Sequence, residues 1–291
     1  MRHVRSSTKA FRPGGSPARV LWSCVLLAGL LLSTALGAAT EAADPWESLR
    51  QQYFGDRPIV AGTRSVIELE APARAEDAAV VPLTIKDKLP SDGARRIRTI
   101  YLFIDKNPGP VAAIFRFAPD SARADIATRV RINEYTNVRA VAETDDGQLF
   151  MDTRFVKASG GCSAPAAKDA EAALARLGKM KVRLQETAAP GTPQLAQLMI
   201  SHPNNSGLQK DQLTGLHIPA HFVREIAVSY AGKPLLTAET TFSLSENPSL
   251  RFYFLPREKG ELKVEAVDTK DQRFSTALEV APHQASAQRT Q

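Results

Sequence analysis

Cysteine is almost absent from this chain, whose 291 residues include only Cys24 and Cys162. Cys24 falls inside the apolar part of an N-terminal segment that has the features of an export signal, so removing that segment leaves one thiol. A disulfide within the processed chain is thereby excluded, because Cys162 has no internal partner. We therefore treat the unpaired thiol of Cys162 as a candidate functional group.

Recognisable enzyme motifs are missing as well. The sequence has no Gly-x-Ser-x-Gly elbow, phosphate-binding loop, dinucleotide fingerprint or Cys-x-x-Cys-His haem-attachment motif. A cysteine hydrolase would need a histidine beside Cys162, and every histidine after the N-terminal segment lies in the other half of the chain. We predict a protein that is not an enzyme and carries no cofactor.

The first 39 residues predict a secretory signal peptide and hence a periplasmic protein. Five basic and no acidic residues precede position 40, an apolar run covers 20–36, and small residues cluster at 35–39. No Arg-Arg pair precedes the run, which favours the general secretory route over the twin-arginine route. The alternative is a retained anchor, but the run is short and interrupted for a membrane span.

Excess positive charge is confined to that segment. The whole chain has 37 basic and 31 acidic residues, a net charge of +6, and the processed chain has 32 and 31. A net charge of +1 over the processed chain argues against a nucleic-acid partner.

The remaining 250 or so residues predict two β-rich halves. Short β-branched and aromatic runs separated by turn residues are typical of antiparallel sandwiches rather than βαβ units. In the first half we expect strands over 65–71, 80–85, 97–105, 111–117, 126–132, 138–144 and 148–156. In the second half we expect strands from about 195 and over 226–230, 235–241, 250–255, 262–266 and 274–280.

Between the halves the pattern changes to one that predicts a helix and a linker. Residues 167–180 are rich in alanine and leucine at helical spacing, Pro165 suits a first helical turn, and Gly178 is a plausible stop. Residues 187–193 are typical of a linker, and the tail from 284 onward is polar and expected to be loose.

Cys162 follows two glycines, Gly160 and Gly161, which suggests a thiol on a flexible arm. A helix beginning at Pro165 would place a positive dipole end near the sulfur and lower its pKa. We therefore expect Cys162 to be accessible and activated, and Cys162→Ser to change stability by less than about 1 kcal/mol. The alternative is a chance cysteine in a loop.

Among the histidines, His217 and His221 have the spacing of a metal pair on a helix, but Pro219 argues against a helix there. Neither these two nor His202 has a cysteine or a clear carboxylate in range. We predict structural or interface histidines and no metal site.

Both halves resemble the subunits of a known sulfur carrier. The first half resembles the end of SoxY, the thiol carrier of the periplasmic sulfur-oxidation system, over residues 128–132, 146–150 and 155–162. The second half resembles its partner SoxZ over residues 200–203, 206–211, 218–222 and 247–252. Together they resemble the fused SoxYZ-like carriers associated with quinoprotein dehydrogenases.

The resemblance implies two immunoglobulin-like antiparallel β-sandwiches, at 44–162 and 194–283, joined by the helix and linker of 163–193. It also implies that Cys162, on the arm of Gly160 and Gly161, holds sulfur intermediates covalently. In SoxY the motif ends the chain as a swinging arm with further glycines, whereas here Ser163 and the whole second half follow. The thiol is therefore expected to have less reach.

These features predict a non-catalytic periplasmic carrier whose cargo, from thiosulfate or a related sulfur species, is joined to Cys162 as a thiosulfonate or persulfide. The implied partners are sulfur-oxidation enzymes, or a quinoprotein dehydrogenase with its c-type cytochrome. The main alternative is an accessory interaction module for such a dehydrogenase, in which the thiol is secondary. A third hypothesis is a metal or redox protein that uses the histidines. We expect the two halves to share a substantial interface, bridged by the helix after Cys162.

Overall fold

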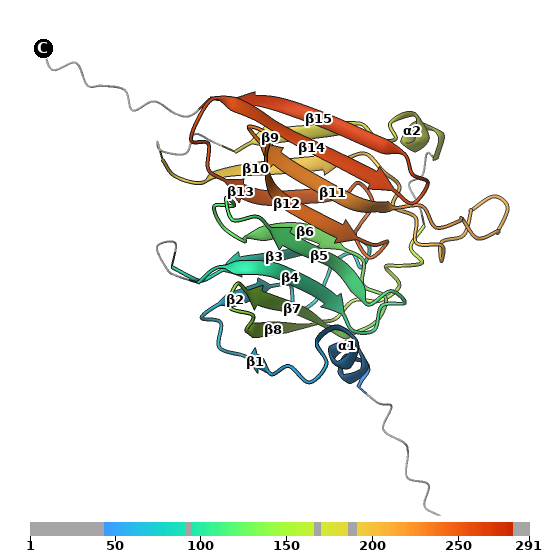
Figure 1. Ribbon diagram of the computed structural model, residues 1–291. Helices are drawn as coiled ribbons and strands as arrows, with labels where there is room; N and C mark the ends of the chain where they lie inside the picture. Colours follow the sequence, from blue (N-terminus) through green and yellow to red (C-terminus); the bar gives the residue numbers. More distant parts are fainter. Residues whose placement is uncertain (1–43, 91–94, 166–169, 186–190, 282–291) are drawn as a thin grey trace, which may run out of the picture. The chain divides into compact units, whose positions relative to one another are not determined.

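Two open, almost entirely antiparallel β-sheets pack face to face in the computed structural model, which describes residues 44–90, 95–165, 170–185 and 191–281. The nine-stranded sheet has the order β1-β8-β7-β4-β5-β12-β11-β14-β15, and the six-stranded sheet has the order β2-β3-β6-β13-β10-β9 (Figure 1). The predicted signal peptide and C-terminal tail lie outside the described residues. No helix in the described part of the chain has the length and apolar character that a membrane span needs.

The first half contributes one helix and eight strands, and seven of these strands were predicted. The helix is α1 (Pro45–Phe54). The strands are β1 (Ile59–Ala61), β2 (Ile67–Glu70), β3 (Val81–Asp87), β4 (Ile97–Ile104), β5 (Val111–Phe117), β6 (Ile126–Val130), β7 (Thr136–Thr144) and β8 (Leu149–Val156).

The second half contains the remaining strands, which follow the short helix α2 (Ala170–Ala175). They are β9 (Met180–Leu184), β10 (Gln194–Ile200), β11 (Val223–Tyr230), β12 (Lys233–Thr240), β13 (Ser249–Phe254), β14 (Gly260–Asp268) and β15 (Arg273–Val280). A tight turn joins β11 to β12, and both of its central residues, Ala231 and Gly232, have positive φ, which matches the twist of a two-residue hairpin.

The two immunoglobulin-like sandwiches are joined edge to edge through both sheets. In the larger sheet β12 pairs with β5 over five residues, from Leu236 opposite Phe117 to Thr240 opposite Ala113. In the smaller sheet β13 pairs with β6 at Arg251 and Ala127. A single cluster of buried side chains runs through both halves. The expected interface between the halves is therefore confirmed, and backbone pairing in both sheets forms it.

Helix α1 explains why β4 is apolar on both faces. Ile100, Leu102 and Ile104 point into the main core, while Phe103 lies in a second cluster with Trp46 and Phe54. Phe54 stacks edge-on against Tyr101 with 5.0 Å between ring centroids. α1 thus covers the outer face of the larger sheet, at β4 and its neighbours (Figure 1).

The segment between the halves differs from the prediction. The structure describes α2 over Ala170–Ala175, and Met180, expected to end the helix, begins β9. β9 pairs with β10 and so belongs to the smaller sheet rather than to a linker. The physical reason is that Met180, Val182 and Leu184 alternate with polar residues and pack against the main core. Most of the predicted linker at 187–193 lies outside the described residues.

Candidate functional site at Cys162

Cys162 lies in a turn after β8, residues 159–163, which we name the Cys162 turn. Two backbone hydrogen bonds attach this turn to the loop after β6: Gly160 N–H donates to the Asn133 carbonyl at 2.8 Å, and Gly161 N–H to the Ile132 carbonyl at 2.9 Å. A Cβ atom on Gly161 would lie 2.0 Å from the Ala78 carbonyl oxygen. Glycine is therefore required at 161 because the backbones approach each other too closely for any side chain.

The second half of the chain also holds the turn. The Ser206 hydroxyl donates a hydrogen bond to the Cys162 carbonyl, and accepts one from the Leu208 backbone N–H. Ser206 N–H in turn donates to the side-chain oxygen of Gln209 at 3.0 Å. Cys162 therefore lies where the two halves meet, with its backbone held from both sides.

Arg131, just after β6, is the charged group of the site. Its side chain is 2% exposed. Nη1 donates to the Gly161 carbonyl at 3.4 Å, and Nη2 donates to the carbonyls of Asn204 and Pro203 at 3.4 and 3.5 Å. One guanidinium thus contacts both the Cys162 turn and the second half.

The Cys162 side chain is fully buried, with 0% exposure. Burial raises the pKa of the thiol to about 11, and the positive charge of Arg131 only partly opposes this effect. At neutral pH the group is therefore a protonated, shielded thiol, since removing a thiol from water disfavours its anion.

One expectation about this site is wrong in this structure. The thiol is neither accessible nor activated, because it is buried and its pKa is raised. The amides of Gly160 and Gly161 are hydrogen-bonded to the loop after β6, and the flexible arm stays a prediction. Pro165 is not helical, and residues 166–169, between it and α2 (Ala170–Ala175), lie outside the described residues, so the structure does not test activation by a helix end. Covalent attachment at Cys162 stays a prediction.

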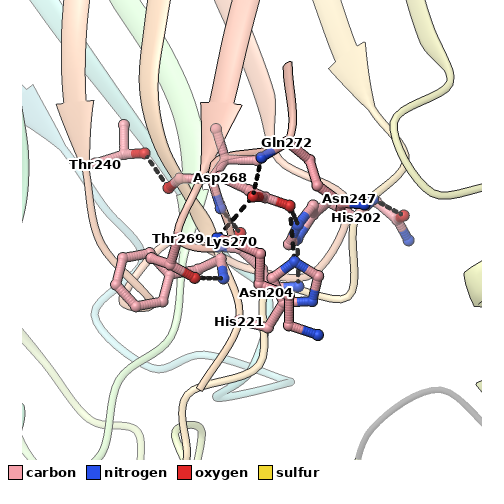
Figure 2. Close-up of polar contacts among 11 residues, drawn as sticks. His202, Asn204, His221, Thr240, Asn247, Asp268, Thr269, Lys270 and Gln272 are labelled. Carbon is pink, nitrogen blue, oxygen red and sulfur yellow. Dashed lines mark hydrogen bonds and ion pairs between the residues drawn. The ribbon is translucent and has the colours of Figure 1, made fainter. Parts of the chain in front are cut away.

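Two histidines form a buried polar cluster with an aspartate that the sequence did not single out. His221 Nε2 lies 2.7 Å and His202 Nε2 3.5 Å from the same carboxylate oxygen of Asp268, and Figure 2 shows both rings directed at it. The other oxygen of Asp268 accepts hydrogen bonds from the backbone N–H groups of Lys270 and Gln272. His217 is exposed and is not one of the three residues of this cluster.

The hydrogen bonds of this cluster favour a structural role over metal binding. The three side chains each offer a ligand atom within 4.8 Å of the others, a spacing compatible with a metal ion. However, Asn204 N–H donates to His202 Nδ1 at 3.0 Å, so the Nε2 of neutral His202 carries the proton and donates to Asp268. A metal would need the lone pair on that nitrogen.

The same cluster shapes the segment that holds Cys162. His202 and Asn247 exchange backbone and side-chain hydrogen bonds, and Asn204 adopts a left-handed conformation with its amide bonded to the Leu244 carbonyl. These contacts fix residues 202–206, and so place Ser206 against Cys162. Burial, followed by the neighbouring His221, lowers the pKa of His202 to about 4.

Comparison with known proteins identifies both halves. Residues 50–162 match the family model of the sulfur oxidation protein SoxY, and residues 181–279 match that of the sulphur oxidation protein SoxZ. The chain is a SoxY domain and a SoxZ domain in tandem. Cys162 is the last residue of the SoxY match. No curated protein matches the chain.

Solved structures give partial likenesses. The sulfur carrier protein SoxY from Chlorobium limicola f thiosulfatophilum is 28% identical over 40% of this chain and 97% of its own, with a TM-score of 0.33. A superoxide reductase (neelaredoxin) from Ignicoccus hospitalis is 16% identical over 34% of this chain and 93% of its own, with a TM-score of 0.30. A putative superoxide reductase from Thermotoga maritima is 16% identical over 35% and 95%, with a TM-score of 0.31.

Three residues of the site had no role in the sequence interpretation: Arg131, Ser206 and Asp268. Arg131 and Ser206 lie inside stretches that resemble SoxY and SoxZ, which is the available signal for both. Asp268 ends a strand and gives no local signal, because its histidine partners are 47 and 66 residues away in the sequence.

Proposed function

We propose that this protein is an exported, non-catalytic carrier that holds a sulfur intermediate covalently on Cys162 and presents it to periplasmic sulfur-oxidation enzymes. The observation that carries the proposal is the position of Cys162: it is the last residue of the SoxY domain and is held by Ser206 of the SoxZ domain. No second cysteine of the processed chain competes for the role.

The thiol chemistry fits such a cargo. Joining the Cys162 thiol to thiosulfate forms one S–S bond and releases one proton and two electrons, so the step needs an electron acceptor. A c-type cytochrome partner is an acceptor of the required kind, because its haem iron takes electrons one at a time. The product is a cysteine with an anionic –S–SO₃⁻ group.

Loading requires the Cys162 turn to open, because the sulfur is shielded in this structure. The turn is held by the hydrogen bonds of Gly160, Gly161, Ser206 and Arg131, each contributing roughly 1 kcal/mol. Opening then costs on the order of 4 kcal/mol, which local fluctuation or a partner enzyme can supply.

The burial of the thiol is also the observation that favours a second function. In that alternative the protein is an accessory interaction module of a quinoprotein dehydrogenase, and Cys162 is a packing residue. Free buried cysteines commonly serve as small apolar side chains, and Cys162 is free and buried.

Mass spectrometry of protein purified from its native periplasm separates the two functions. The carrier predicts a sulfur adduct on Cys162, and the accessory module predicts an unmodified thiol with a co-purifying dehydrogenase. Complementation of a deletion strain by Cys162→Ser and Cys162→Ala gives the functional test. The Ala variant is needed because a serine hydroxyl at a buried site costs about 1–3 kcal/mol when it lacks a partner. Growth on the sulfur substrate with either variant would refute the carrier.

A further inference from the structure

Arg131 is a buried cation that forms no direct ion pair in the described part of the chain. Burial lowers its pKa, and the charges of Glu246 and Asp77 oppose this effect only in part. Among the described residues, no carboxylate lies within ion-pair distance of its guanidinium, whereas the similarly buried Arg139 lies 2.8 Å from Asp105. The Nε atom of Arg131 has no hydrogen-bond partner, and its three side-chain hydrogen bonds are all long, at 3.4 to 3.5 Å. Buried charges are normally paired, so an anion placed beside this guanidinium would be stabilised.

Gln209 is a second buried donor with the same deficit. Its side chain is fully buried, its Oε1 accepts the Ser206 N–H, and its Nε2 group has no partner. Gln209 is linked to Cys162 through Ser206, and Arg131 contacts the adjacent carbonyl of Gly161. Unused N–H donors therefore flank the Cys162 turn from the SoxY side and from the SoxZ side.

Both groups supply N–H donors without partners, and Arg131 also supplies a positive charge. The ligand class that matches this environment is an anion with several oxygen acceptors. A neutral adduct such as a methyl disulfide would leave the same donors without partners. These donors should therefore distinguish an anionic adduct from a neutral one.

We propose that Arg131, assisted by Gln209, is the positioning residue that holds the anionic end of a Cys162 adduct against the protein. The inference rests on the proposed function, and names the residues that would bind the anionic group of the cargo. It differs from a purely structural role, in which Arg131 only ties the carbonyls of Gly161, Pro203 and Asn204 together. A structural role would stabilise every form of Cys162 alike.

The test compares an anionic and a neutral adduct on the full processed chain. The thiolate attacks a central sulfur of tetrathionate, forming Cys–S–S–SO₃⁻ and releasing thiosulfate. With S-methyl methanethiosulfonate it forms Cys–S–S–CH₃ and releases methanesulfinate. Both reactions are run on chain unfolded in urea, so that burial does not limit them, and the denaturant is then removed.

The measured quantity is the unfolding equilibrium constant of each adduct, from denaturant titration. In the unsubstituted protein the unfolding equilibrium constant of the anionic adduct should be at least about tenfold smaller than that of the methyl adduct. This is the effect of a buried charge-assisted hydrogen bond. Arg131→Gln should abolish or invert this ratio, and Arg131→Lys should keep part of it. Arg116→Gln removes the same charge from an exposed side chain and should leave the ratio unchanged.

Gln209→Glu provides a second variant if Arg131→Gln fails to fold. It keeps the acceptor for Ser206 but replaces the free donor by an anion, so it should lower the ratio. An unchanged ratio in Arg131→Gln and Gln209→Glu, or failure of both adducts to refold, would overturn the inference. Failure of the proposed carrier function would give a different result: Cys162 would be unmodified in protein purified from the native periplasm.

Discussion

The chemistry of Cys162 in this structure is dominated by desolvation. A thiol held at a pKa of about 11 is almost entirely protonated at neutral pH, and its attack on electrophilic sulfur must wait for the turn to open. Arg131 counteracts burial, yet burial is the larger effect. Cys162, which the sequence predicted to be an exposed nucleophile, is thus buried and protonated in this structure.

Alkylation kinetics measure this protection. In native protein at neutral pH, Cys162 should react on the order of 10³ times more slowly than a free cysteine, given about 4 kcal/mol for opening. In urea the rate should rise to the free value. A native rate equal to that of free cysteine would contradict the closed turn.

A second prediction concerns His202 and the stability of the protein in acid. Its folded pKa of about 4 lies below the ordinary value of 6.5, so the unfolded chain takes up the proton first as pH falls. Stability is therefore complete above pH 6.5 and decreases between pH 6.5 and 4, by up to about 3 kcal/mol. The pKa of Asp268 is lowered despite its burial, mainly by the hydrogen bond from His221, and adds to the loss at lower pH.

Denaturant titrations between pH 7 and 4.5 check this expectation. His202→Gln removes the titrating ring and should flatten the pH dependence, while the exposed His217→Gln serves as the matched control. Equal slopes for both variants would show that His202 does not cause the acid effect.

Secondary-structure elements were largely predictable where periodicity and turn chemistry agreed. β4, β5, β7 and β8 have nearly their expected bounds, because each is a β-branched or aromatic run that ends at turn residues. β1, β9 and α1 were missed, since β1 has three residues and the other two lie in mixed sequence. The sequence could also not show the docking of the Cys162 turn, because its partners Ala78, Arg131 and Ser206 are distant in the chain.

The close backbone approach at Gly161 gives a prediction for the turn as an element. Gly161→Ala places a Cβ against the Ala78 carbonyl, so the turn should leave its position and Cys162 should alkylate at least about tenfold faster. Gly62→Ala is the control, since Gly62 has a positive φ but open space around it. It should cost about 1 kcal/mol of stability without changing the alkylation rate. Equal rates in Gly161→Ala and unsubstituted protein would argue against the docked turn.

On the scale of the whole molecule, the two domains behave as one because they share both sheets. Sequence patterns define each sandwich separately, but the pairings of β5 with β12 and of β6 with β13 depend on chain segments more than 100 residues apart. A resemblance to two partner proteins predicted contact, and the structure specifies that it is made by backbone pairing.

Unfolding should accordingly be a single transition. Once residues 1–39 are removed, Trp46 is the only tryptophan, and it reports on the SoxY domain alone. Phe254→Ala, in the core of the SoxZ domain, should lower stability by about 3–5 kcal/mol and shift the Trp46 fluorescence midpoint as much as the circular dichroism midpoint. Separate midpoints would mean that the domains unfold independently.

Because the Ser206 hydroxyl and the Cys162 carbonyl that it binds belong to one chain, the shielding of the thiol should not depend on protein concentration. When two separate proteins provide the thiol and the group that covers it, protection falls as they are diluted and dissociate. Here both belong to one chain, so closure is unimolecular and its effective concentration is set by the fold. The fraction of thiol exposed should then be the same in a dilute and in a concentrated solution of the protein.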